Sequence, residues 1–278
     1  MHDLTILIPI YNEEKYILET LLSLIEQTYR NFLCVLSDNN SSDKSEEICN
    51  KIVAKDKRFI YFKHDVNLGI TKNVEFLLSK ITSEYVMIFA GHDLIEKEFL
   101  SKTLNVLKMN DDVSLSFSKS IAIDENSNII KEKVAIRYDF TGNALSRYIH
   151  SVKELGECTI FQGIFRAKVL ENFSFTESIP GGDQIFISHL LWYGKLHITE
   201  ESTYKRRYFL QKTTTYAERN SGDIKQKLSF SLMYQTYLDD FNSLYKGPEN
   251  YRAFLNNKIL DILTLRYGLG YLYHEDYK

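Results

Sequence analysis

Residues 85–95, YVMIFAGHDLI, run from a continuous apolar stretch into a glycine, a histidine and an aspartate. The apolar part, residues 85–90, has the length and residue types of a strand buried on both faces, where no alternation with polar residues is expected. A buried strand does not normally end in two ionisable side chains unless they cap something or meet a ligand. The stretch therefore predicts an interior strand of a parallel sheet, with His92 and Asp93 at its ligand-binding end.

Three further apolar runs lie upstream, and each is followed by a helical pattern. In the first helical segment apolar residues recur at the spacing of one helix face, and Asn12 is expected to cap it. Alternation of short apolar strands with helices predicts an α/β fold whose parallel sheet is covered on both faces. The predicted strands are residues 4–10 (LTILIPI), 32–36 (FLCVL) and 59–63 (FIYFK).

Polar residues follow each of the four strands. In an open α/β sheet, ligands bind outside the carboxyl ends of the strands, so these residues predict a binding edge. They are Tyr11, Asn12 and Glu13 after the first strand, residues 38–43 after the second, His64, Asp65 and Asn67 after the third, and His92 and Asp93 after the fourth.

After residue 112 the pattern changes to a mixed half. Residues 113–124 (VSLSFSKSIAID) alternate like a strand with one solvated face, and a second strand is predicted at 129–136. A helix at 143–152, a strand at 159–165 and a helix at 182–193 follow, and the chain reads as helical from residue 222. With no repeat and no low-complexity linker, we expect one compact body in two parts.

Bulk properties exclude several classes of protein. A net charge of -3 and a pI near 6.2 argue against a general nucleic-acid footprint. Three widely spaced cysteines suggest neither a disulfide framework nor a zinc site. No signal peptide is recognised, and no apolar stretch reaches eighteen residues. We expect a cytoplasmic protein, either free or peripheral at the inner membrane face.

Five segments, in order, resemble family 2 glycosyltransferases, and the similarity extends over roughly residues 3–210. The resemblance implies the GT-A fold, a Rossmann-like mixed, mainly parallel sheet flanked by helices. Residues 1–215 would form the glycosyltransferase domain, with a nucleotide-binding half at 1–112 and an acceptor half at 113–215, and residues 216–278 a helical C-terminal appendage. The segments are residues 5–29 (TILIPIYNEEKYILETLLSLIEQTY), 33–48 (LCVLSDNNSSDKSEEI), 67–93 (NLGITKNVEFLLSKITSEYVMIFAGHD), 161–173 (FQGIFRAKVLENF) and 181–196 (GGDQIFISHLLWYGKL).

The resemblance assigns the first strand ends to the nucleotide. An aspartate carboxylate at Asp38 suits the N3–H of uracil, which is only a donor; the alternative is that Asp38 merely shapes its turn and that Asp43 caps a helix. Lys72 stands where the family often has a basic residue near the diphosphate, although a solvated lysine would look the same. The implied nucleotide-binding residues are Pro9, Tyr11, Glu13, Asp38, Asn39, Asn67, Gly69, Lys72 and His92.

The family's D-x-D motif aligns with Gly91-His92-Asp93, so only the second acid is present. In the family that acid binds the divalent ion on the diphosphate, which implies a metal-binding role for Asp93 with Mn²⁺ or Mg²⁺. One carboxylate with substrate phosphates can suffice for Mg²⁺. His92 has a second reading as a Mn²⁺ ligand, and Asp93 one as a simple cap.

Asp183 aligns with the family's general base, although Gly182 replaces the preceding glutamate. The helix that it opens should lower its pKa, and desolvation by the substrates would have to raise the pKa again. The alternative reading is an N-cap. Arg206 and Arg207 would contact phosphate or form a solvated charge run, and His189 is expected to pack against the sheet.

The resemblance thus implies an inverting transfer of a sugar from a nucleotide-sugar, with UDP favoured, to a hydroxyl of a glycan or lipid-linked glycan. A non-catalytic nucleotide-sugar- or glycan-binding homologue is the alternative, because both acidic motifs are degenerate. A sugar-nucleotidyltransferase should have a glycine-rich basic loop after the first strand, and residues 11–14 (YNEE) are the wrong chemistry. C-terminal tyrosines would stack on sugars, contact a membrane, form a homodimer face or fill the core; they are Tyr234, Tyr237, Tyr267 and Tyr271.

Overall fold

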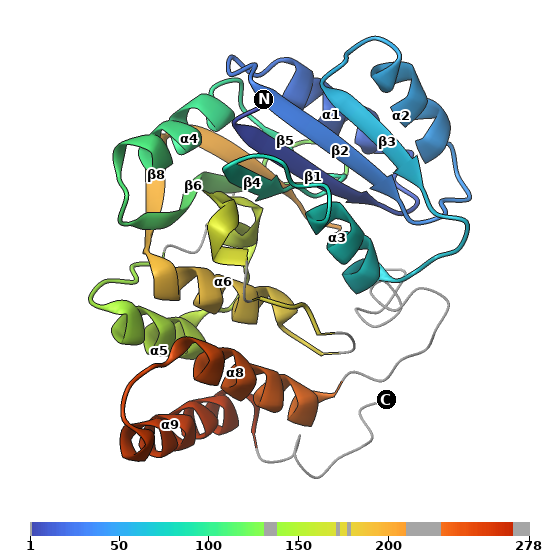
Figure 1. The fold of residues 1–278 in the computed structure, drawn as a ribbon. Helices are drawn as coiled ribbons and strands as arrows, with labels where there is room; N and C mark the ends of the chain where they lie inside the picture. The colour runs from blue at the N-terminus through green and yellow to red at the C-terminus, as the bar shows by residue number, and fades with distance from the viewer. Residues whose placement is uncertain (1, 131–137, 171–172, 177–178, 210–228, 269–278) are drawn as a thin grey trace.

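The structure is a computed structural model that describes residues 2–130, 138–170, 173–176, 179–209 and 229–268. Within them one eight-stranded sheet has the order β3-β2-β1-β4-β7-β6-β8-β5 (Figure 1). The strands are β1 Leu4–Ile10, β2 Phe32–Asp38, β3 Phe59–Lys63, β4 Tyr85–Ile88, β5 Leu94–Ile95, β6 Val113–Ile123, β7 Ile164–Arg166 and β8 Lys195–Arg207. The helices are α1 Ile17–Ile25, α2 Ser45–Val53, α3 Ile70–Leu78, α4 Phe99–Met109, α5 Ala144–Glu154, α6 Gly182–Tyr193, α8 Phe230–Leu244 and α9 Glu249–Tyr267, with short 3₁₀ turns η1 Thr159–Gln162 and η2 Ala167–Leu170.

The first four predicted strands form the parallel half of the sheet. Ile6 in β1 is in register with Cys34 in β2 and Met87 in β4, and all three side chains are fully buried. Helices α1 and α2 lie on one side of these strands and α3 on the other, as right-handed crossovers require (Figure 1). Burial on both faces is the reason that these strands appear in the sequence as unbroken apolar runs.

The second half of the sheet is mixed, as predicted. Strand β7 pairs antiparallel with both β4 and β6, β8 pairs parallel with β6, and β5 pairs antiparallel with β8. The strand predicted at 159–165 is wrong in its first part, because residues 159–162 form η1 before β7 begins. Gly163 allows this turn to meet β6, since a Cβ there would lie 2.6 Å from the Ser116 carbonyl oxygen. Most of the strand predicted at 129–136 lies outside the described residues.

A second hydrophobic core joins the C-terminal helices to the rest. Helices α8 and α9 pack on α5 and α6 (Figure 1), and Tyr234 and Tyr237 are buried there, which confirms the core reading for these two tyrosines. Tyr271 and the predicted boundary at 215/216 fall outside the described residues. The helical C-terminal region is thus packed directly on the helix that begins at Gly182.

His189 is buried between hydrogen-bond partners. It does not simply pack against the sheet as expected, because its ring nitrogens contact Asp240 on α8 and the Val169 carbonyl oxygen of η2.

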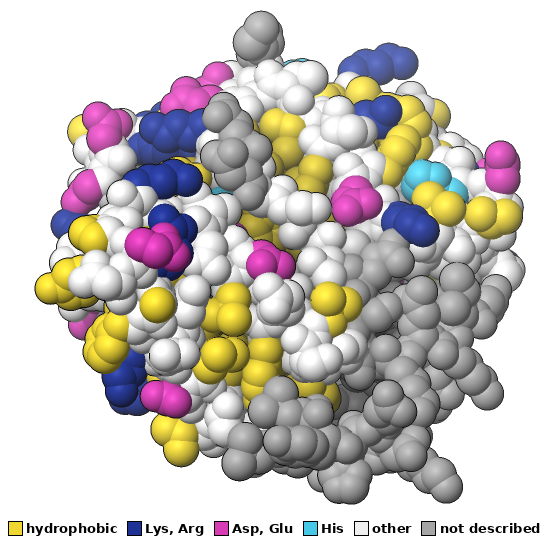
Figure 2. Space-filling model, turned by 60° about the horizontal axis from the view of Figure 1, so that its bottom comes forward, with side chains coloured by type: hydrophobic (Ala, Val, Ile, Leu, Met, Phe, Trp, Pro, Cys, Tyr) yellow, Lys and Arg dark blue, Asp and Glu magenta, His cyan; other side chains and the backbone are white. Residues whose placement is uncertain are grey.

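The surface carries charges of both signs. On the face turned forward in Figure 2, acidic and basic side chains are interspersed and hydrophobic ones show between them towards the centre. Of the helices within the described ranges, none has the length and apolar character needed to cross a membrane.

Candidate active site

The loops that follow β1 and β2 are joined by hydrogen bonds between side chains and backbone. The backbone N–H of Asn12 donates to Ser41 Oγ over 2.9 Å, and Ser42 N–H donates to Asn12 Oδ1 over 2.9 Å. The predicted cap of α1 by Asn12 is wrong, because Asn12 has a left-handed φ of 55° and its side chain serves the other loop. Asp43 does stabilise the start of α2 by accepting from Ser45 N–H, and it also accepts from Glu14 N–H.

Asp38 is fully buried at the end of β2. Its Oδ1 accepts from Ser41 N–H over 2.6 Å, and its Oδ2 accepts from the Tyr61 hydroxyl over 2.7 Å. The alternative reading, that Asp38 shapes its turn, therefore describes this conformation. A nucleobase could contact the carboxylate only after the surrounding loop had moved.

The loops after β2 and β3 are joined by a pair of amides. Asn39 Nδ2 donates to Asn67 Oδ1 over 2.7 Å, while Asn39 Oδ1 accepts from Leu68 N–H over 2.8 Å. Gly69 N–H also donates to Asn67 Oδ1, and Gly69 has a φ of 80°. A glycine is favoured at that backbone conformation, as the sequence suggested. Three other predicted nucleotide-binding residues flank this edge: Pro9 is half-buried, and Tyr11 and Lys72 are exposed. They are not among the described residues that line the cavity introduced in the next paragraph.

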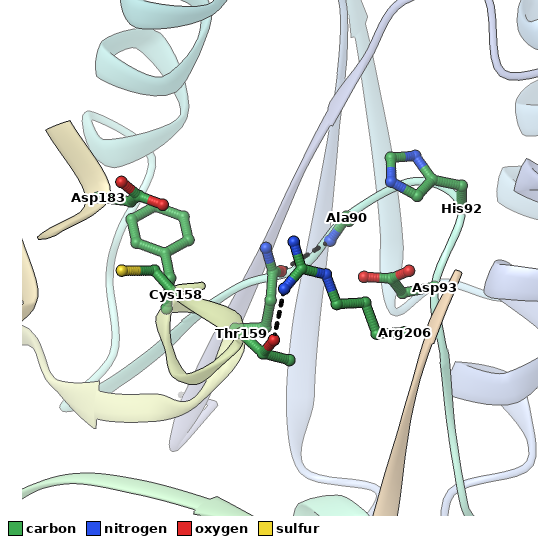
Figure 3. Close-up of a pocket in the computed structure, with 9 residues that line it drawn as sticks. Ala90, His92, Asp93, Cys158, Thr159, Asp183 and Arg206 are labelled. Carbon is green, nitrogen blue, oxygen red and sulfur yellow. Dashed lines mark hydrogen bonds between the residues drawn. The ribbon is translucent and has the colours of Figure 1, made fainter. Parts of the chain in front are cut away.

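The end of β4 brings His92 and Asp93 to a cavity of about 150 Å³. Figure 3 shows Asp183 and Cys158 on one side of it, His92 and Asp93 on the other, and Arg206 between them. The predicted base, metal ligand and phosphate contact thus come together from α6, β4 and β8. The lining residues are Ala90, His92, Asp93, Cys158, Thr159, Phe161, Gln162, Asp183 and Arg206.

Asp93 joins the end of β4 to β8. Its Oδ2 accepts from the Tyr204 hydroxyl over 2.6 Å, and its Oδ1 accepts from Arg207 N–H over 2.7 Å. Each oxygen retains a second lone pair, so the carboxylate can still bind a cation from the cavity side. Asp93 therefore has a structural role whether or not it also binds metal.

Glu13 lies over Gly91, the position where the aligned motif lacks an acid. A Cβ at Gly91 would lie 3.3 Å from Glu13 Cγ, and Glu13 Oε1 is 2.8 Å from His92 Nδ1. Burial acts to lower the pKa of His92, but the Glu13 carboxylate, with help from Asp93, raises that pKa to about 9. A carboxylate from the first loop thus adjoins the position of the missing acid, and His92 is a cation at neutral pH.

Asp183 lies in the first turn of α6. Its Oδ1 accepts from Gln184 N–H over 2.9 Å, and the N-cap residue is Gly181, with a φ of 69°, so the N-cap reading of Asp183 is wrong. Burial raises the pKa of Asp183, and this outweighs the opposing effects of backbone N–H groups and of the Arg206 cation. The protein itself therefore supplies the desolvation that the sequence alone would leave to the substrates.

The two arginines near the end of β8 have different environments. Arg206 lines the cavity, where its Nη1 donates to Thr159 Oγ1 over 2.7 Å and approaches Glu157 Oε2 at 3.3 Å. Arg207 is buried, and its guanidinium donates to protein acceptors, so the geometry does not favour a phosphate contact by Arg207. The acceptors are Glu19 Oε2, Ser127 Oγ and the carbonyl oxygens of His92 and Asp124.

Five of the residues that line the cavity were not identified from the sequence: Ala90, Cys158, Thr159, Phe161 and Gln162. Gln162 Oε1 accepts from Ala90 N–H over 2.9 Å and ties η1 to the end of β4. Thr159 was hidden because residues 159–165 read as a strand, and Cys158 directly precedes that run. For Gln162 a signal existed, since it lies in the family-like segment FQGIF at 161–165.

A divalent ion fits this site only together with substrate oxygens. Among the residues that the structure describes, no three His, Cys, Asp or Glu side chains form a group able to hold a metal. Asp93 offers one carboxylate to the cavity, and Mg²⁺ is often bound by one or two carboxylates plus phosphates. The donor set is compatible with that arrangement.

The sequence matches known glycosyltransferases. A family model described as Glycosyl transferase family 2 matches residues 5–170. An uncharacterized glycosyltransferase of Methanocaldococcus jannaschii is 35% identical over 132 residues, 47% of this chain and 46% of that protein. The GalNAc(5)-diNAcBac-PP-undecaprenol beta-1,3-glucosyltransferase of Campylobacter jejuni is 25% identical over 190 residues, 66% of this chain and 58% of that protein. The chain thus spans about half the length of these relatives.

Solved structures share the fold. Residues 1–349 of S. aureus TarS in complex with UDP-GlcNAc superpose with a TM-score of 0.68 at 18% identity, over 95% of this chain and 73% of that one. The mannosyltransferase PcManGT from Pyrobaculum calidifontis, in complex with GDP-Man and Mn²⁺, gives a TM-score of 0.55 at 14% identity, over 99% and 76%. These likenesses confirm the expected GT-A fold. The family model matches more than half of the chain, which therefore belongs to glycosyl transferase family 2.

Proposed function

We propose that this chain is an inverting glycosyltransferase that moves a sugar from a UDP-sugar to a hydroxyl of a glycan or lipid-linked glycan. The observation that carries the proposal is the cavity with Asp183 on one side, His92 and Asp93 on the other, and Arg206 between them. Glycosyl transfer needs a base for the acceptor hydroxyl and positive charge for the departing diphosphate. The TarS complex with UDP-GlcNAc and the C. jejuni enzyme's name support the donor and acceptor classes.

Asp183 is the proposed general base. Its carboxylate takes the proton of the acceptor hydroxyl as the oxygen attacks the anomeric carbon, and the bond from that carbon to the diphosphate breaks on the opposite face. A pKa raised by burial suits this role, because a base is most effective when its pKa approaches the working pH. A single displacement of this kind inverts the anomeric configuration.

Arg206 and His92 are the proposed cations for the diphosphate. Arg206 lines the cavity and donates a hydrogen bond to the Thr159 hydroxyl. Nδ1 of His92 contacts the Glu13 carboxylate. A divalent ion, when bound, would be held by Asp93 and would supply further positive charge to the leaving group. The nucleoside would lie along the edge formed by Tyr11, Asn39 and Asn67.

Two measurements test this function. UDP affinity is measured by calorimetry with and without Mn²⁺, and transfer and hydrolysis are measured across a panel of UDP-sugars. Asp183→Asn should bind UDP like the wild type and lose at least about 100-fold in kcat. Asp261→Asn is the matched control, because Asp261 is an exposed carboxylate on α9 that pairs with Lys258.

Each outcome separates the proposal from its rival. Tight UDP binding with neither hydrolysis nor transfer by the wild type would favour a non-catalytic nucleotide-sugar-binding protein. Undiminished turnover in Asp183→Asn would remove the proposed base. Inversion is read from the anomeric coupling constant of the product by NMR, and a retained configuration would contradict the single displacement.

A further inference from the structure

The last turn of α9 contacts the segment that carries Asp183. Arg266 donates from its guanidinium to the carbonyl oxygens of Val152 and Leu155, at the C-terminal end of α5. The Tyr267 hydroxyl donates to Gln184 Oε1 over 2.7 Å, and Arg266 Nη2 approaches the same oxygen at 3.3 Å. Two adjacent side chains of the C-terminal helix thus meet on the amide oxygen of one residue of α6.

Gln184 is coupled to Asp183 through the backbone. Its N–H is 2.9 Å from both Asp183 Oδ1 and the Gly181 carbonyl oxygen, so this peptide helps to orient the carboxylate. The Gln184 amide also lies against Gly181, where a Cβ would be 3.4 Å from Gln184 Cδ, and its Nε2 is 3.4 Å from the Gly156 carbonyl oxygen. Because both the oxygen and the nitrogen of the Gln184 amide have partners, this side chain restrains the turn at Gly181 and Gly182, which glycine would otherwise leave flexible.

Arg266 also stabilises a second wall of the cavity. Its positive charge lies at the carboxyl end of the α5 dipole, and its fork binds two carbonyl oxygens there. The chain continues from this point through Gly156 to Cys158 and Thr159, which line the cavity. Burial raises the pKa of the Cys158 thiol well above its ordinary value, and the Arg206 and Arg266 cations both oppose that effect.

We infer that Arg266 and Tyr267 are positioning residues for Asp183, and that the C-terminal helix α9 thereby contributes to the acceptor side of the site. This rests on the proposed function, because it assumes that Asp183 is the base. A displacement of a reacting group by about 1 Å can lower a rate about 100-fold, so a hydrogen bond to a neighbouring amide is enough to matter. The contact between α9 and Gln184 is the route by which the helical region affects catalysis.

Two conservative variants test the inference. Tyr267→Phe removes only the hydroxyl, and Arg266→Lys keeps the charge but cannot form the planar fork. Each should lower kcat about 10-fold, with donor KM and UDP affinity within about twofold of the wild type. Tyr251→Phe and Lys258→Gln are the matched controls, since both side chains are exposed on the same helix, and they should leave kcat unchanged.

A double-mutant cycle shows whether Tyr267 acts through Gln184. In a Gln184→Ala background, Tyr267→Phe should cause no further loss of kcat, whereas independent effects would multiply. If Arg266→Lys does not fold, Tyr267→Phe and the cycle decide alone. If the variants lost UDP affinity and Tm together with kcat, the role of Arg266 and Tyr267 would be merely structural and the inference would be overturned.

The two proposals fail in distinguishable ways. Wild-type kcat in Tyr267→Phe and Arg266→Lys, with an inactive Asp183→Asn, would refute the positioning role and leave the proposed base in place. Full activity in Asp183→Asn would refute the base itself. The acceptor KM is measured for each variant, because a loss confined to KM would indicate an acceptor contact and not a positioning role.

Discussion

His189 on α6 and Asp240 on α8 form a buried pair in which Nδ1 lies 2.7 Å from Oδ1. The other ring nitrogen lies 2.9 Å from the Val169 carbonyl oxygen, so both ring nitrogens face acceptors. The Tyr148 hydroxyl donates to the second Asp240 oxygen over 3.0 Å. The second core therefore holds a hydrogen-bonded cluster that joins α5, α6 and α8.

Removing one partner of this pair should be costly. Asp240→Ala leaves a buried His189 ring nitrogen and the buried Tyr148 hydroxyl without their acceptor, and we expect the free energy of unfolding to fall by about 3 kcal/mol. Urea denaturation followed by circular dichroism measures the change. Asp239→Ala is the control, because the neighbouring Asp239 is exposed and its carboxylate accepts from Gln235. Similar losses in both variants would contradict the assignment.

Glu13→Gln should weaken donor binding. The variant keeps the shape of the side chain that covers Gly91 but removes the charge that holds His92 as a cation, so the pKa of His92 should fall towards 6.5. We expect UDP affinity to drop about 10-fold, a loss of about 1.4 kcal/mol, as for a hydrogen bond to a charged group. NMR titration of the His92 ring and calorimetry with UDP measure the two effects. Glu26→Gln, at an exposed site, should change neither.

The pairing of His92 with Glu13 makes the stability of the fold depend on pH in a defined direction. The folded-state pKa of His92, about 9, is above the unfolded value of 6.5, so its stabilising contribution is fully present below pH 6.5 and is lost as the pH rises through 9. Relative to His92→Gln, the wild type should therefore be most stabilised at low pH, and the difference should vanish above pH 9. Urea denaturation of both proteins across this range measures the difference, and a difference that grew with pH would contradict the pairing.

Arg206→Gln should change both the affinity and the pH profile. The Arg206 cation opposes the effect of burial on Asp183, so its removal should raise the pKa of Asp183 further and shift the acid limb of kcat to higher pH. UDP should bind about 10-fold more weakly, since a charge-assisted contact is lost. Lys205→Gln, one residue earlier in β8 and not among the described residues that line the cavity, is the control. An unshifted acid limb would argue that Asp183 is not the group seen in the profile.

The parallel half of the fold could be predicted from the sequence because its strands are buried on both faces. Residues 4–10 and 85–88 read as apolar runs for that reason, and the polar residues that follow them predict a binding edge. The turn at 159–162 could not be predicted, because a contact with the distant Ala90 N–H fixes Gln162. An apolar run of this length is compatible with a strand until that partner is known.

Within the site, the sequence supplied the residue types but not their partners. Arg206 and Arg207 are adjacent and chemically identical, yet only Arg206 lines the cavity, because alternate residues of a strand point to opposite faces. The Glu13–His92 pair joins residues 79 positions apart, so neither spacing nor periodicity could have revealed it. For the same reason the sequence indicates a nucleotide contact at Asp38 and cannot reveal that the Tyr61 hydroxyl donates to its carboxylate.

The closeness of Glu13 to Gly91 also limits which sequences this site can tolerate. A side chain at position 91 would begin 3.3 Å from Glu13 Cγ, and an aspartate there would set a second carboxylate beside the first. A side chain at position 91 therefore requires the Glu13 side chain to shift by a few tenths of an ångström. The effect of a substitution at either position thus depends on the residue at the other.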